Sequence, residues 1–247
     1  MRNLMKYEFR KTWAFKVLLL GAAVVAEIVF LIGLYGGLDR VLGVSVLLLT
    51  MLAICGVMAI GLGSVVQLYR DMNTKQSYML FMTPNNSYKI LGAKALENAF
   101  SVLLSGIFFG VLAALDFWLL LRENGGFQDL IDMVTQMLKS IDPRLEISAK
   151  PLITVLFLML CSWILKIVTG YLAVVISCTL LSGKKAAGVI SFALYIAISL
   201  LTAWGIEMLP DAKDVIGNLL IISAASLVCS VVMYFITAWI MDKKLSV

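Results

Sequence analysis

Two ionisable side chains lie deep inside apolar stretches of this sequence, where a charge is costly. Glu27 is near the middle of the apolar run 14–38, and Lys166 is near the middle of the run 152–181. A charge at the centre of a bilayer costs about 3 kcal/mol or more, so such residues are candidates for a polar route or a structural pair. The two residues have opposite charges at similar depth. A pair across a helix interface and a neutral Glu27 with Lys166 facing a wet cavity are both compatible with the sequence.

Glu97 is a third candidate for an intramembrane charge. It lies near the inner end of the apolar run 90–121, close enough in sequence to Lys94 for a pair on one helix surface. Asp116 lies near the outer end of the same run. We expect both acids to be solvated at the membrane interface.

Several kinds of chemistry have no recognisable residues in this chain. It contains no histidine, which excludes histidine-ligated metal sites and histidine general bases. Gly183-Lys184 is not a phosphate loop, because Cys178 stands where the earlier glycine is required. All four cysteines lie in apolar runs, so we expect free, buried thiols and no disulfide framework. We therefore expect that the chain is not an enzyme and that it has no catalytic residue, metal or cofactor of its own. We also expect no nucleic-acid partner.

The composition indicates an all-α membrane protein. Of the 247 residues, 62% are hydrophobic and 14% are charged, whereas soluble domains carry about 25% charge. Apolar runs of about 20 residues or more are long enough to cross a bilayer as helices. The sequence predicts a single transmembrane domain, 1–247, with six spans at 14–38, 41–68, 90–121, 152–181, 186–208 and 216–241.

The distribution of basic residues predicts the orientation of these spans. Six spans place both termini on one side, and that side carries 13 of the Lys and Arg residues, against six on the other side. Cytoplasmic segments carry the excess of positive charge, so both termini are predicted to be cytoplasmic. The polar loop 122–151 is then extracellular, and its apolar spacing over 127–140 predicts an amphipathic surface helix.

The first sixteen residues predict an interfacial elbow helix before the first span. Met5, Phe9 and Trp13 share one helical face, and basic residues surround them. This pattern suits a helix that lies on the anionic inner leaflet with Trp13 at the interface. The residues that define the elbow are Arg2, Lys6, Phe9, Arg10, Lys11 and Trp13.

The polar segment between the second and third spans, 70–89, predicts a short docking helix. Asp71 or Asn73 can cap its start, and Pro84 ends it because proline removes a backbone donor. Its apolar patch has no apolar medium around it and therefore must meet headgroups or another protein. We expect the patch, which consists of Tyr78, Met79, Phe81 and Met82, to bind a soluble partner.

Three stretches resemble the permease subunits of bacterial type 2 class ATP-binding-cassette (ABC) exporters. Lys6-Tyr-Glu-Phe-Arg-Lys11 is similar to the basic, Glu-containing stretch before that family's first span. Leu80-x-x-Thr83-Pro84-x-x-Ser87 is similar to its Leu-x-x-Thr-Pro-Val-Ser segment, and Ile90-Leu-Gly-Ala-Lys94 to the Ile-Leu-x-x-Lys that opens its third span. The layout of six spans is also similar over the whole chain.

The resemblance implies a coupling helix in the segment 70–89, on which a separate ATPase subunit docks. Tyr78, Leu80, Phe81 and Met82 would enter the cleft of that subunit. The coupling residues that the resemblance implies are Met72, Gln76, Tyr78, Met79, Leu80, Phe81, Met82 and Pro84. Two ATPase copies would bind ATP and Mg²⁺, and a second permease copy, identical or related, would complete the pathway. The expected location is the bacterial plasma membrane. The cargo that the resemblance implies is a small amphipathic or antimicrobial peptide, as in exporters of phenol-soluble modulins, or another hydrophobic substrate.

Two other classes of function remain open from the sequence. One is a secondary carrier or channel that needs no ATPase, and the other is a membrane scaffold that transports nothing. The low number of charges within the predicted spans favours the exporter over a carrier.

Overall fold

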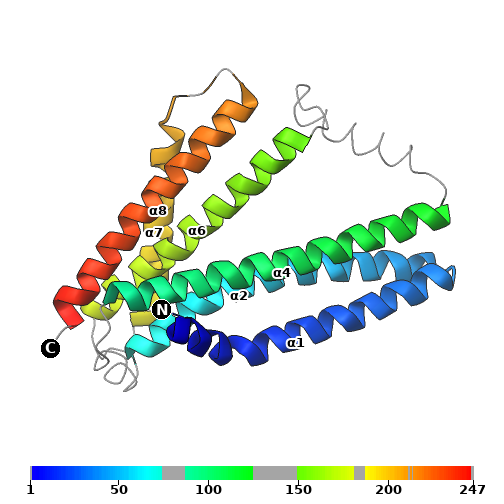
Figure 1. The fold of residues 1–247 in the computed structure, drawn as a ribbon, viewed down its shortest axis with the longest axis horizontal. Coiled ribbons are helices and arrows are strands. Elements are labelled where there is room, and N and C mark those ends of the chain that lie inside the picture. Colours follow the sequence, from blue (N-terminus) through cyan, green and yellow to red (C-terminus); the bar gives the residue numbers. More distant parts are fainter. Residues whose placement is uncertain are drawn as a thin grey trace. The chain divides into compact units, whose positions relative to one another are not determined.

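The computed structural model describes residues 2–73, 87–124, 149–180, 187–210, 212 and 214–245 (Figure 1). Over these residues the chain forms six α-helices and no strand. The helices are α1 (Arg2–Tyr35), α2 (Asp39–Asn73), α4 (Ser87–Asn124), α6 (Ala149–Leu180), α7 (Ala187–Glu207) and α8 (Val215–Leu245).

All six helices are long and apolar enough to cross a membrane. Each contains one of the predicted spans to within a few residues, because a helix is the structure that satisfies every backbone hydrogen bond of an apolar segment internally. The all-helical prediction with six membrane-length helices is thus confirmed. The predicted helices at 127–140 and within 74–86 lie outside the described residues.

Two helix boundaries differ from the sequence prediction. Residues 2–16 are not a separate element but the first part of α1, which continues to Tyr35. At the other boundary, α2 continues through Asn73, so Asp71 lies inside its last turn, where it is buried, and does not cap a new helix. Both helices are longer than predicted because their polar ends find partners inside the protein.

The chain divides into two compact units. The first unit comprises residues 1–64 and 89–125, and the second comprises residues 65–88 and 126–247. Helices α2 and α4 contribute to both units. The single transmembrane domain that the sequence predicts for residues 1–247 remains a prediction.

The first unit is built on the hairpin of α1 and α2 and on α4. At the hairpin turn, a Cβ on Gly33 would lie 2.8 Å from the backbone nitrogen of Leu42, so only glycine permits this approach. Gly37 completes the turn with a positive φ of 63°. Farther from the turn, Leu19 and Ala23 pack with Phe109, and nearer the turn Ala26, Phe30 and Leu49 form a second apolar layer.

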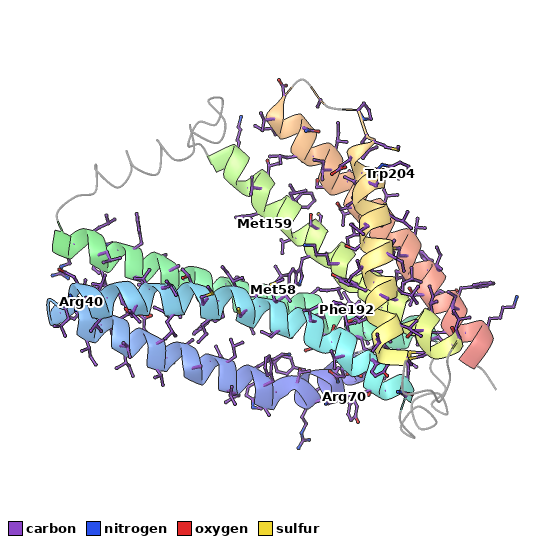
Figure 2. The ribbon with its side chains drawn as sticks, turned by 180° about the vertical axis from the view of Figure 1, so that it is seen from behind. Arg40, Met58, Arg70, Met159, Phe192 and Trp204 are labelled. Atoms are coloured by element: carbon purple, nitrogen blue, oxygen red, sulfur yellow. The ribbon has the colours of Figure 1, made fainter. Side chains whose placement is uncertain are left out.

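The second unit is centred on α6, which packs against both α7 and α8. The face of α8 that is buried there carries small hydroxyl side chains at helical spacing: Ser223, Ser226, Ser230 and Thr237. Their hydroxyls donate to carbonyls one turn earlier in the same helix, so the helices can approach closely without unpaired donors. On the opposite side of the unit, Phe192 and Trp204 are among the exposed side chains of α7 (Figure 2), as expected for a lipid-facing surface.

Candidate functional site

A buried ion pair joins the first turns of α1 to α4. Lys94 donates a hydrogen bond to Oε1 of Glu8 at 2.8 Å. The two side chains are only 3% and 4% exposed. Two charges removed from water in this way are stable only as a pair, because each would otherwise carry a large desolvation penalty.

A second ion pair lies about two turns farther along α1. Lys16 donates to Oε1 of Glu97 at 2.5 Å and to the hydroxyl of Ser101 at 2.6 Å. Ser101 and Thr12 donate to the same carboxylate oxygen, at 2.7 and 3.5 Å. The Lys16 ammonium also lies 4.2 Å from the centre of the Phe9 ring, a cation–π contact. The expectation for Glu97 was therefore wrong: it is 5% exposed, and its partner is Lys16 rather than Lys94 or solvent.

Asn98 extends this polar cluster toward α2. Its side-chain amide donates to the hydroxyl of Ser64 at 2.7 Å and to the carbonyl of Gly61 at 3.3 Å. Asn98 is completely buried, and its Oδ1 atom has no hydrogen-bond partner among the described residues. We call Glu8, Thr12, Lys16, Ser64, Lys94, Glu97, Asn98 and Ser101 the polar seam.

The polar seam follows from the helical period of α4. Lys94, Glu97, Asn98, Ser101 and Ser105 recur at steps of three and four residues, which places them on one face of the helix. All five are buried. Sequence reasoning considered Lys94 and Glu97 only as a pair with each other and missed the other members, although this spacing was the signal that could have found them.

Two carboxyl groups meet farther along the same helix pair. Glu27 of α1 and Asp116 of α4 lie next to each other. One oxygen of each group is buried and has no hydrogen-bond partner among the described residues. Asp116 was expected at the interface but is partly buried beside Glu27.

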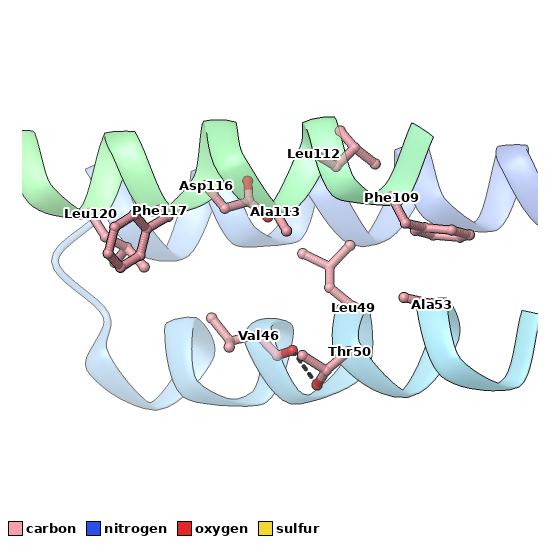
Figure 3. A pocket seen from close by; sticks show the side chains of 10 residues that line it. All are labelled: Val46, Leu49, Thr50, Ala53, Phe109, Leu112, Ala113, Asp116, Phe117 and Leu120. Carbon is pink, nitrogen blue, oxygen red and sulfur yellow. Dashed lines mark hydrogen bonds between the residues drawn. The ribbon is translucent and has the colours of Figure 1, made fainter. Parts of the chain in front are cut away.

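Asp116 also lines a pocket between α2 and α4. The pocket has a volume of about 220 Å³ and is lined by four residues of α2 and six of α4 (Figure 3). The Asp116 side chain and the Thr50 hydroxyl are its polar groups, and that hydroxyl already donates to the carbonyl of Val46 at 2.9 Å. The remaining lining side chains are apolar, so the pocket suits apolar groups such as acyl chains.

Other predicted site residues have different surroundings. Lys166 is exposed on α6, and because it belongs to the second unit, a pair with Glu27 would have to join the two units and stays a prediction. Met72 is partly buried in the last turn of α2. The other coupling residues lie outside the described residues: Gln76, Tyr78, Met79, Leu80, Phe81, Met82 and Pro84.

Most of the predicted elbow residues lie on the exposed side of α1, away from the polar seam. Lys6, Arg10, Lys11 and Trp13 are exposed, together with Tyr7. Phe9 is half-buried, and the centre of its ring lies 5.5 Å from that of Trp13 in a tilted contact. Arg2 is the first residue of the helix. The first part of α1 therefore has one side bonded to α4 and a basic, aromatic side directed outward.

The described residues contain no group of three or more His, Cys, Asp or Glu side chains that could hold a metal ion. The described cysteines are free thiols, but Cys55 is exposed and only Cys161 is buried, so burial was predicted correctly for just one of them. Comparisons with protein families, with characterised proteins and with solved structures found no match for the chain.

Proposed function

We propose that this chain is the permease subunit of an ABC exporter of the bacterial plasma membrane. In this proposal both termini are cytoplasmic, and the segment 70–89 is the coupling helix for a separate ATPase that binds ATP and Mg²⁺. Two ATPase copies and a second permease copy complete the transporter. The cargo class is a small amphipathic peptide or another hydrophobic substrate.

The observation that carries this proposal is the position of the motif-bearing segment. Residues 80–94 carry the resemblance to the exporter permeases, and they begin in the polar connection that follows α2 and continue into α4. Both flanking helices are long enough to cross a membrane, so the connection is a polar segment at a membrane surface. The side of the membrane is inferred from the excess of basic residues.

The first part of α1 supports the same proposal. Its basic face suits the anionic inner leaflet, while its opposite side is bonded to α4 through Glu8 and Lys16. The elbow is bonded to α4 at Lys94, a few residues after the coupling segment. In this proposal that bond holds the start of α4 in place where the ATPase binds.

The test is association with the ATPase encoded by a neighbouring gene that carries a Gly-x-x-x-x-Gly-Lys-[Ser/Thr] motif. Phe81→Asp places a charge in the proposed contact and is expected to abolish co-purification in detergent while membrane insertion persists. Phe81→Leu keeps the side chain apolar and serves as the matched control. Phe127→Asp makes the same change in the predicted extracellular segment and should leave association intact. Retained association of Phe81→Asp would remove the docking proposal.

A second candidate function is a secondary carrier, and one observation favours it. Glu27 and Asp116 lie next to each other at membrane depth, and carriers use such acids as proton relays. If this candidate is correct, the purified chain alone moves solute in reconstituted vesicles when a proton gradient is applied. The exporter proposal requires that the chain alone shows no such flux.

A further inference from the structure

The start of α4 is fastened to α8. The hydroxyl of Ser87 donates to Oδ1 of Asp242 at 3.3 Å, and the hydroxyl of Tyr234 donates to the carbonyl of Tyr88 at 2.7 Å. The rings of Tyr88 and Phe235 add a contact with centroids 6.3 Å apart. All these residues belong to the second unit, so the first two residues of α4 are held by α8.

The end of α2 is packed against the other two helices of the same unit. Val65 packs against α6 at Gly170, where a Cβ added to the glycine would lie 2.9 Å from Cγ2 of Val65. The Tyr69 hydroxyl lies 3.4 Å from the place that a Cβ on Gly188 of α7 would occupy. The same hydroxyl accepts a hydrogen bond from the side-chain amide of Asn73. Leu68, between them in sequence, is completely buried.

The three helices that receive these ends are themselves tightly joined. Ser177 of α6 and Ser191 of α7 are hydrogen-bonded, and the Thr169 hydroxyl of α6 lies 3.4 Å from the sulfur of Met233 on α8. The helix that ends at residue 73 and the helix that begins at residue 87 are therefore anchored on one packed unit. Closely packed elements move together when one of them is displaced.

We infer that Tyr234 and Asp242 are positioning residues that carry a displacement of the start of α4 into α8. This inference rests on the proposed function, in which an ATPase moves the segment between α2 and α4. The contacts to α8 involve the first residues after that segment, whereas the ion pair of Lys94 with Glu8 begins two turns later. A push on the segment would thus reach α8 before it reaches α1.

A crosslinking experiment tests the geometry without any partner. Ser87→Cys and Asp242→Cys are introduced together into the full chain with its native cysteines replaced, and a protease site is placed within residues 125–148. A short bismaleimide is expected to keep the two fragments joined after proteolysis. Ser87→Cys with Ser226→Cys is the control, because position 226 lies about 24 Å farther along α8. Equal crosslinking of the two pairs, or none of Ser87→Cys with Asp242→Cys, would overturn the inference.

A second experiment tests the coupling in the complex with the ATPase. An environment-sensitive fluorophore on Lys243→Cys reports the end of α8 when ATP is added. Tyr234→Phe removes only the hydroxyl that donates to the Tyr88 carbonyl. The equilibrium constant of the ATP-dependent change, obtained from the fluorescence signal, is expected to fall about fivefold, as for the loss of one net hydrogen bond. Tyr195→Phe on α7 is the matched control and should leave the signal unchanged.

The two possible failures are distinguishable in this experiment. If the unsubstituted chain does not co-purify with the ATPase, the proposed function fails. If Tyr234→Phe co-purifies normally and gives the full ATP-dependent signal, the proposed function survives and the role of Tyr234 is wrong.

Discussion

Glu8 and Lys94, 86 residues apart in sequence, form an ion pair that is almost completely removed from solvent. The pair fixes the register between α1 and α4. The pairs Lys16–Glu97 and Glu27–Asp116 follow at separations of 81 and 89 residues, so the two helices run in the same direction over most of their length. The first part of α1 is therefore anchored to the protein and not only to lipid.

Breaking the Glu8–Lys94 pair is expected to destabilise the protein strongly. Lys94→Met removes the ammonium that donates to the buried Glu8 carboxylate, and breaking a buried ion pair from one side costs about 3 to 5 kcal/mol. Glu8→Met with Lys94→Met removes both charges of this pair and should recover most of the loss. Thermal unfolding of the purified protein in detergent measures both. A Lys94→Met protein as stable as the unsubstituted chain would show that the pair is not buried.

Gly33→Ala is expected to open the turn between α1 and α2. The added Cβ would lie 2.8 Å from the Leu42 nitrogen, and backbone atoms cannot move aside cheaply, so we expect a loss of about 1 to 3 kcal/mol. Gly21→Ala is the matched control, since nothing lies within 4 Å of its added Cβ and alanine favours helix. Equal effects of the two substitutions on the thermal midpoint would contradict the close approach.

Glu27→Gln is expected to keep or raise stability. A glutamine amide at position 27 can donate a hydrogen bond to the neighbouring Asp116 carboxylate, which is worth about 1 kcal/mol. Glu27→Leu offers no donor to Asp116 and should therefore be less stable than Glu27→Gln. The comparison of the two thermal midpoints checks the contact. A more stable Glu27→Leu would show that the carboxyl groups do not support each other.

The basic face of α1 is expected to select anionic lipid. Lys6→Gln with Arg10→Gln removes two exposed charges, each worth about 1 kcal/mol near an anionic surface. Mass spectrometry of lipids that co-purify with the protein should show a severalfold lower ratio of anionic to zwitterionic phospholipid. Arg122→Gln with Lys150→Gln, on the opposite predicted side, is the control. The same drop in both proteins would point to net charge alone.

Cysteine labelling tests the predicted orientation. In a chain whose four native cysteines are replaced, Gly126→Cys should react with an impermeant maleimide on intact cells. Thr83→Cys should react only after the cells are opened. The reverse pattern would place the coupling segment outside the cell and remove the ATPase proposal.

The number and approximate bounds of the membrane-length helices followed from the sequence because that signal is local. Twenty or more consecutive apolar residues favour a helix in lipid whatever the rest of the chain does. The small differences arise at the helix ends. Residues 2–16 and Asp71 are polar enough to resemble separate segments, yet they are continuous with α1 and α2, where Glu8 and Asp71 are buried through contacts that the sequence does not reveal.

Only the tertiary structure decided which charges meet. From sequence, Glu97 was closest to Lys94, three residues away, and Glu27 was considered with Lys166 because the two have opposite charges at similar predicted depth. The parallel packing of α1 on α4 instead brings Lys16 to Glu97 and Asp116 to Glu27. Apolar length determines that a segment enters the membrane, but the register of one helix on another depends on the shapes and polar groups of both, and a single segment does not contain that information.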